Sequence, residues 1–318
     1  MESARPRSTT QGFELTVIVV AYNAEGHISR TIEKLELSLG RHRAEIIIID
    51  NNSLDRTGEL ADRALTTGSV VSLSQNVGYG RGANEGLRRA RGRFSIIMND
   101  DVTIDSESID MLLSVLEKPN VRLVAPRMAN PTGGTLPSGR RYLPGLRDEV
   151  ARIGDFVTRR RRRLVEPLVG PPVRVDFVLA ACLMVESQFL RSIGGFSDRF
   201  FMYGEDIDLC RRVKEIGGDI LLVPSATACH DQAVAGERRF RGHEFTERIL
   251  SARDTYYRIW LPTWERILVN LIRALGPRDQ PFRFKHHISR AFSTNDSLAH
   301  ERMPRSLEPL FDESNQGS

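Results

Sequence analysis

The sequence predicts an α/β protein with a mainly parallel, Rossmann-like sheet that has helices on both faces. Short apolar segments rich in β-branched residues alternate with segments in which apolar residues recur at helical spacing. Strands that are apolar nearly throughout suit a sheet covered on both sides. Strand–helix–strand repetition also implies right-handed crossovers, which make neighbouring strands parallel.

Seven segments are expected to form strands, and four patterns are expected to form helices. The strands are residues 15–23, 45–50, 70–76, 94–100, 121–126, 173–186 and 219–230. Apolar residues at helical spacing predict helices over 28–39 and 109–116. A short helix ends at Gly194–Gly195, and a further helix begins within FFMYGEDIDLCRR and ends at Gly217–Gly218.

The second half of the chain contains a region without periodicity. Gly, Pro and Arg dominate residues 130–172, which we expect to be a long loop of the kind that is functional or disordered. Within it, Arg159–Arg163 is a run of five arginines, either a solvated loop or a contact for phosphate or anionic lipid. A helical pattern with several Tyr and Trp residues returns over about 238–275, and the polar tail after 291 is expected to be disordered.

Composition favours an intracellular globular protein. The 318 residues are 40% hydrophobic and 27% charged, which suits one large domain or a domain with an appendage. The three cysteines form no CxxC pair, so a disulfide framework is not expected and a reducing cytosol is the default. The N-terminal segment lacks the apolar core of a secretory signal, and we expect a cytoplasmic protein.

Polar residues follow most of the predicted strands. Ligands of open parallel sheets gather at the carboxyl ends of the strands, so these residues are candidates for a binding site. A single Asp at a strand end is more often the N-cap of the next helix, but several polar ends at one edge favour a site. The residues are Tyr22, Asn23, Asp50, Asn51, Asn52, Asn76, Asn99, Asp100, Asp101 and His230.

Two of these strand ends suit a metal ion, the one at Asn99–Asp101 and the one at His230. Asn99, Asp100 and Asp101 provide oxygen ligands of the kind that a hard divalent cation prefers, although a helix start explains them equally well. His230 alone is more often structural, yet it becomes a plausible ligand if the acids bind metal. The glycine-rich segment NVGYGRGANEG, which includes Arg81, lets backbone approach a ligand but is a weak dinucleotide fingerprint.

Three carboxylates crowd into the segment FFMYGEDIDLCRR. On a helix, Glu205 and Asp208 share one face while Asp206 points elsewhere. Acids at a helix N-terminus are favoured by the helix dipole, which explains one or two of them without catalysis. Asp206 lies near the helix start between apolar residues, where it could serve as a general base.

Together these motifs resemble glycosyltransferase family 2, the inverting enzymes of GT-A fold, and in particular its bacterial rhamnosyltransferase-like branch. The resemblance covers roughly residues 13–260 and is carried by VIVVAYNAEGHI, IIIIDNNSLDRT, NVGYGRGANEGLRRARG, IIMNDDV and the segment from Val175 to His230. It implies a lead-in over 1–12, a catalytic domain over 13–237, a helical C-terminal extension over 238–290 and a tail over 291–318.

The resemblance also implies roles for individual residues. Asp206 would be the catalytic base and Glu205 would orient the acceptor. Asp101 and His230 would hold Mg²⁺ or Mn²⁺ on the donor diphosphate, with Asn99 in support. The residues implied to bind the nucleotide sugar are Tyr22, Asn23, Asp50, Asn52, Gly78, Arg81, Asn84 and Asp100.

The implied reaction is metal-dependent transfer from a nucleotide sugar, best represented by dTDP-rhamnose, to a saccharide or lipid-linked saccharide. A UDP- or GDP-sugar donor stays open, as do the pathway (cell wall or another polysaccharide) and a peripheral membrane contact. Two departures from the family pattern are Ala180, where a glycine is usual, and the segment DQAVAGERR after His230. Ala180 would narrow the floor of the acceptor region.

Two other classes of function are weaker alternatives. A Rossmann-type oxidoreductase would need a GxGxxG after the first strand, which instead ends in AYNAEG. A nucleic-acid binder would carry its positive charge along a stripe, whereas here the charge is concentrated in one loop.

Overall fold

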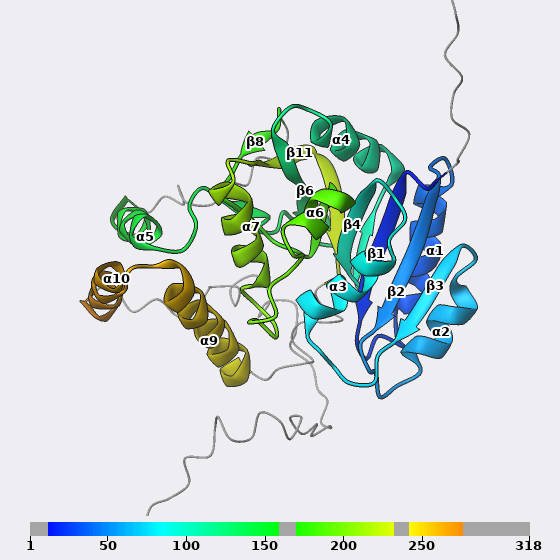
Figure 1. Ribbon diagram of the computed structural model, residues 1–318, viewed down its shortest axis with the longest axis horizontal. Coiled ribbons are helices and arrows are strands. Elements are labelled where there is room, and N and C mark those ends of the chain that lie inside the picture. The colour runs from blue at the N-terminus through cyan, green and yellow to red at the C-terminus, as the bar shows by residue number, and fades with distance from the viewer. Residues whose placement is uncertain (1–11, 159–169, 232–241, 276–318) are drawn as a thin grey trace, which may run out of the picture. The chain divides into compact units, whose positions relative to one another are not determined.

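A computed structural model describes residues 12–158, 170–231 and 242–275 (Figure 1). Most of the expected lead-in over 1–12 and all of the tail over 291–318 lie outside the described residues, as does the Arg159–Arg163 run. Most of the segment DQAVAGERR also lies outside them.

The fold is built on a nine-stranded mixed sheet in the order β3-β2-β1-β4-β10-β6-β11-β5, with β8 paired to β11. A separate two-stranded sheet pairs β7 with β9. The strands are β1 (Leu15–Ala21), β2 (Ala44–Asp50), β3 (Gly68–Ser72), β4 (Phe94–Asn99), β5 (Val102–Ile104), β6 (Val121–Ala129), β7 (Gly139–Arg140), β8 (Val173–Arg174), β9 (Phe177–Val178), β10 (Cys182–Glu186) and β11 (Asp219–His230).

Parallel pairing joins β3, β2, β1 and β4, and it joins β6 to β11. Between these two blocks β10 pairs antiparallel with both β4 and β6. The α/β prediction is therefore confirmed. The single strand expected over 173–186 is instead divided into β8, β9 and β10, because these pieces pair with β11, β7 and β4 respectively and no straight strand reaches all three partners.

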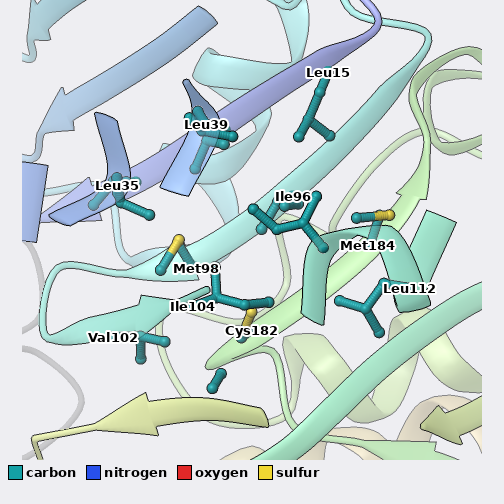
Figure 2. Close-up of a cluster of buried hydrophobic side chains, with 14 of the residues drawn as sticks. Leu15, Leu35, Leu39, Ile96, Met98, Val102, Ile104, Leu112, Cys182 and Met184 are labelled. Carbon is teal, nitrogen blue, oxygen red and sulfur yellow. The ribbon is translucent and has the colours of Figure 1, made fainter. Parts of the chain in front are cut away.

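Helices cover both faces of the sheet. One face packs against α1 (Ile28–Leu39), α2 (Thr57–Ala64) and α4 (Ser106–Leu116), and the other against α3 (Tyr79–Arg89), α6 (Ser187–Ser192) and α7 (Glu205–Glu215). Successive residues of β1 point to opposite faces, as in any strand. Val17 and Val19 thus belong to the first layer, and Ile18 and Val20 to the second. Figure 2 shows part of the first layer, where Leu35 and Leu39 of α1 lie near Ile96 and Met98 of β4.

The region expected to be a loop contains a helix, α5 (Leu146–Thr158). It packs against α10 (Thr263–Leu275), which follows α9 (Gly242–Trp260) after a break at Leu261–Pro262. A third apolar cluster, formed by Phe200 and residues of α9 and α10, joins this helical region to the segment before α7. Among the described residues no helix is long and apolar enough to cross a membrane.

The close packing of α3 on β1 gives a stability prediction. A Cβ added at Gly86 would lie 2.3 Å from Ile18 Cγ2, whereas one added at Gly154 of α5 would meet nothing within 4 Å. We expect Gly86→Ala to lower the free energy of unfolding by about 1–3 kcal/mol, because overpacking outweighs the helix propensity of alanine. Gly154→Ala, the control, should be neutral or raise stability by up to about 1 kcal/mol in urea unfolding. Equal stability of the two variants would contradict this packing.

Candidate active site

The parallel strands end at one edge of the sheet, where they bring the predicted polar residues together. The register pairs Ala21 of β1 with Asp50 of β2, and Val20 with Asn99 of β4. The residues that directly follow these strands therefore share this edge. Asp50 is buried and accepts a hydrogen bond from the Ser53 amide at 3.0 Å.

Asp100 connects the end of β4 to the end of β1. Its Oδ2 accepts a hydrogen bond from the backbone amide of Tyr22 at 3.0 Å, and its Oδ1 lies 3.3 Å from His27 Nε2. Asp100 is 2% exposed. Its carboxylate therefore fixes the spacing of two strand ends and of the residue that precedes α1.

Asp101 differs from Asp100 because its buried carboxylate receives no hydrogen bond among the described residues. The residue is 4% exposed, and both carboxylate oxygens lack a hydrogen-bond donor. His230 Nε2 lies 3.1 Å from Asp101 Oδ1. The two meet because Val102 pairs with His230 in the β5–β11 ladder, and the Asp231 amide donates to the Asp101 carbonyl.

This arrangement fits a divalent cation. An isolated buried carboxylate is costly, and a cation removes that cost. Adjacent ligands of an octahedral Mg²⁺, each about 2.1 Å from the metal, lie about 3 Å apart, close to the observed separation of Asp101 and His230. Among the described residues no group of three or more His, Cys, Asp or Glu gathers at one point.

The glycine-rich segment is held against the same edge by Asn51, which follows β2. The Asn51 side chain accepts from the Val77 amide at 2.9 Å and donates to Asn76 Oδ1 and to the Gly78 carbonyl. The strand-end pattern included Asn51, but it gave no sign of this structural role.

Gly78 fits closely against the segment before α7. Its φ is +85°, and a Cβ at this position would lie 2.0 Å from the Phe201 carbonyl oxygen. The Tyr79 amide donates to the same oxygen at 3.1 Å. The glycine therefore allows the predicted donor loop to contact the segment that leads to the acidic cluster.

The other predicted nucleotide-sugar residues occupy two places. Asn23 and Asn52 adopt positive φ angles at the strand edge, and Asn23 Oδ1 accepts from the Leu54 amide at 2.8 Å. Asn84 bonds both ends of its amide to the Phe196 backbone, at 2.8 Å each. Arg81 donates to the Asp198 carbonyl and is half exposed. Their predicted roles in donor binding stay predictions.

The three acids at the start of α7 are in different environments. Glu205 and Asp208 are 5% and 3% exposed and face the interior, as their spacing predicts. Asp206 is half-buried. The helix begins after Gly204, which has a φ of +113°. The backbone at Gly204 lies close to Phe200 and to Ala252 of α9. The turn therefore sets the direction in which each acid points.

Asp206 is held by backbone groups. Its Oδ1 accepts from the Ile207 amide at 2.8 Å, and its Oδ2 lies 3.5 Å from the Ala180 amide. The Tyr79 hydroxyl donates to the Ala180 carbonyl at 2.5 Å, which joins the glycine-rich segment to this site. Burial raises the pKa of Asp206 to about 6, partly offset by these amides.

The neighbouring carboxyl group of Glu205 is also affected by burial. Burial, together with the negative charge of Asp206, raises the pKa of Glu205 to about 8. Its Oε2 is buried with no hydrogen-bond partner among the described residues. Two adjacent carboxyl groups with raised pKa values favour the sharing of one proton, an arrangement from which acid and base roles can arise.

Asp208 has a structural role, because its carboxylate joins α7 to α9 and positions Arg212. It accepts from Trp260 Nε1 of α9 at 2.8 Å and from Arg212 Nε at 2.8 Å. Arg212 also donates to the carbonyls of Ile193 and Gly195. Sequence reasoning missed Trp260 and Arg212; only the i,i+4 spacing of Asp208 and Arg212 could have indicated their pair.

The fold and the site define a class of enzyme, the glycosyltransferases of GT-A fold. Residues 16–175 match Glycosyl transferase family 2. Because this match spans half of the chain, the protein belongs to that family. The assignment confirms the predicted family and the predicted enzyme class, a glycosyltransferase.

The chain is similar to curated members of the family. It is 29% identical over 239 residues to the N-acetylglucosaminyl-diphospho-decaprenol L-rhamnosyltransferase of Mycobacterium tuberculosis, covering 69% of this chain and 76% of the relative. It is 23% identical over 262 residues to the low-salt glycan biosynthesis hexosyltransferase Agl10 of Haloferax volcanii, covering 76% of each. The predicted likeness to a rhamnosyltransferase branch is thereby confirmed.

Solved structures share the fold. GalNAc-T7, crystallised with UDP, GalNAc and Mn²⁺, superposes with a TM-score of 0.57 at 17% identity. That comparison covers 84% of this chain but only about half, 52%, of the GalNAc-T7 chain. Residues 1–349 of S. aureus TarS give a TM-score of 0.51 at 15% identity, covering 87% of this chain and 77% of that one. These comparisons support the GT-A fold.

The contact between Trp260 and Asp208 gives the second prediction. Trp260→Phe removes the N–H donor and keeps an aromatic ring beside Arg211, so the Asp208 carboxylate loses one hydrogen bond. We expect the free energy of unfolding to fall by about 1.5–3 kcal/mol, as for bonds to charged groups. Trp264→Phe, at a tryptophan 62% exposed, is the control and should stay within about 0.5 kcal/mol in urea unfolding. Equal effects would show that the hydrogen bond does not hold α9 to α7.

Proposed function

We propose that this protein is an inverting, metal-dependent transferase that moves a sugar from a nucleoside diphosphate to a saccharide hydroxyl. One observation carries the proposal. Asp101, a buried carboxylate without a hydrogen-bond donor, and Asp206, a half-buried carboxylate held by amides, lie on different elements. An inverting transfer needs a cation at the leaving group and a separate base for the acceptor.

Asp101 and His230 would hold the divalent cation, Mg²⁺ or Mn²⁺. When bound, the cation would neutralise the negative charge that develops on the departing diphosphate. The buried Asp101 carboxylate supports this assignment, because its oxygens receive no hydrogen bond among the described residues and its Oδ1 lies 3.1 Å from His230 Nε2. GalNAc-T7, which shares the fold, was crystallised with Mn²⁺.

Asp206 would act as the general base. It accepts the proton of the acceptor hydroxyl while that oxygen forms a bond to the anomeric carbon and the bond from that carbon to the diphosphate breaks. Attack opposite the leaving group inverts the anomeric configuration. Glu205, neutral at pH 7, would donate a hydrogen bond to the acceptor and leave Asp206 as the base.

The donor would lie along the strand edge. Tyr22, Asn23, Asp50, Asn52 and Asp100 would position the base and ribose, because they follow strands that end side by side. The glycine-rich segment would line the sugar pocket with Gly78, Arg81 and Asn84. In this arrangement residues 13–237 form the catalytic domain and 238–290 its helical extension.

We assign dTDP-rhamnose as the donor and a lipid-linked saccharide as the acceptor. The support is the likeness to the M. tuberculosis protein, whose name gives L-rhamnose and a diphospho-decaprenol acceptor. A UDP- or GDP-sugar is the second candidate, because the likeness to a hexosyltransferase also allows another sugar and names no nucleotide. Transfer assays with each nucleotide sugar, with and without metal, distinguish these donors.

Substitution of the two acids tests the mechanism. Asp206→Asn should lower kcat by about 10²–10⁴-fold, the usual range for a lost general base, with donor KM and Mn²⁺ binding unchanged. Asp101→Asn should instead raise the Mn²⁺ concentration needed for half-maximal rate by at least about tenfold, because a metal ligand is lost. Asp62→Asn, an exposed aspartate of α2, is the matched control. Full transfer by Asp206→Asn would refute the base assignment.

The raised pKa of Asp206 gives a pH prediction. A base works only when ionised, so kcat should fall as the pH drops through about 6 and should be constant above it until other groups titrate. Glu205→Gln, which keeps a neutral side chain, should retain this acid limb. An acid limb near pH 8 that disappears in Glu205→Gln would instead identify Glu205 as the base.

A further inference from the structure

Helix α5 has the reverse of the usual polarity. Its charged residues Asp148, Glu149 and Arg152 are buried, and Arg152 Nε donates to Glu149 Oε2 at 2.6 Å. Its apolar residues are outside instead: Val150, Phe156 and Val157 are 56%, 63% and 72% exposed. A helix that packs on a protein core and meets water normally shows the opposite arrangement.

Helix α10 buries Val269 in the third apolar cluster but also exposes apolar residues on another face. Trp264, Ile267 and Leu271 are 62%, 62% and 54% exposed, and they recur at helical spacing. Leu268, 37% exposed, lies beside them. The acid Glu265 instead points to α5, where it accepts from the Leu146 amide at 3.0 Å.

The two helices form one structural pair, drawn side by side in Figure 1. Arg273 Nη1 of α10 lies 3.7 Å from Glu149 Oε1 of α5, so an ion pair adds to the contact of Glu265 with Leu146. The exposed apolar residues of this pair are called the outer apolar set. They are Val150, Phe156, Val157, Trp264, Ile267, Leu268 and Leu271.

We propose that the outer apolar set inserts into the interfacial layer of an anionic lipid bilayer. Seven exposed apolar side chains on two adjacent helices exceed the scattered single residues that are normal on a protein surface. Helices of 13 residues are too short to span the hydrocarbon core, so they would lie in the plane of the interface. Trp264 has the indole ring that is enriched at that level of a membrane.

Charge favours anionic lipid over a protein partner. On the described part of the pair, the exposed charged side chain is Arg147, whereas Asp148 and Glu149 are buried and Asp155 and Glu265 are half-buried. The sequence also continues from Thr158 directly into the five arginines Arg159–Arg163. A surface with exposed apolar and cationic side chains, and with its acids turned inward, matches an anionic interface.

The proposal deepens the assignment of a lipid-linked acceptor. It rests on that assignment only for the reason why the protein would bind a membrane. Such an acceptor is confined to a membrane, so an enzyme adsorbed there meets its substrate at a high local concentration. Binding to lipid itself needs neither donor nor metal. Vesicle binding and sugar transfer can therefore fail independently of each other.

Co-sedimentation of the full chain with vesicles tests the proposal. The vesicles are phosphatidylcholine alone or phosphatidylcholine with phosphatidylglycerol, and the variant is Ile267→Ser combined with Leu271→Ser. We expect wild-type protein to sediment with the anionic vesicles and the variant to bind at least about tenfold more weakly, because two apolar side chains no longer insert. The control is Leu37→Ser combined with Leu54→Ser, at leucines 83% and 70% exposed elsewhere, which should bind like wild type.

Three results would overturn the proposal. The first is wild-type protein that does not sediment with anionic vesicles, and the second is a variant that binds as well as wild type. The third comes from light scattering without vesicles. If wild-type protein is a dimer and the variant is a monomer, a second copy of the chain covers the outer apolar set. Sugar transfer to a water-soluble acceptor is the folding control, and it should be equal in wild type and variant. If the variant loses this activity, it has a folding defect, and its weaker vesicle binding does not support the proposal.

Discussion

The burial of Asp101 without a hydrogen-bond donor is the constraint on which the active site depends. A carboxylate in that position is unfavourable unless a positive charge lies beside it. The β5–β11 register brings His230 to this carboxylate, with Nε2 3.1 Å from Asp101 Oδ1, and the two side chains would hold the proposed cation together. Burial of Asp101 thus lowers the stability of the fold. In the proposed function, binding of the metal and the donor would offset that cost.

The acids of α7 show how one short segment serves structure and chemistry together. Asp208 is satisfied by Trp260 and Arg212, which fixes the start of the helix. Burial raises the pKa of both Glu205 and Asp206, the two acids of the proposed reaction. The helical extension is therefore part of the support of the proposed base, and α10, which continues that extension, carries part of the proposed membrane surface.

Sequence patterns predicted the parts of the fold that depend on local chemistry. Strands such as 15–23 and 45–50 are buried on both faces, so their apolar runs were clear. The division of 173–186 depends on which strands lie nearby, and no local pattern contains that information. Helix α5 was missed because its apolar residues face outward and its acids inward. Asp101, Asp206 and His230 could be selected as candidates from strand ends and a helix start, whereas Trp260 meets Asp208 across 52 positions.

The most direct test of the central claim is the position of the cation. Crystals grown with Mn²⁺ and the nucleoside diphosphate of the active donor would reveal the metal by its anomalous scattering. The proposed mechanism predicts one peak at coordination distance from Asp101 Oδ1 or Oδ2 and from His230 Nε2, bridged to the diphosphate, with no peak at Asp206. A metal coordinated by Asp206, or a diphosphate bound away from Asp101, would contradict it.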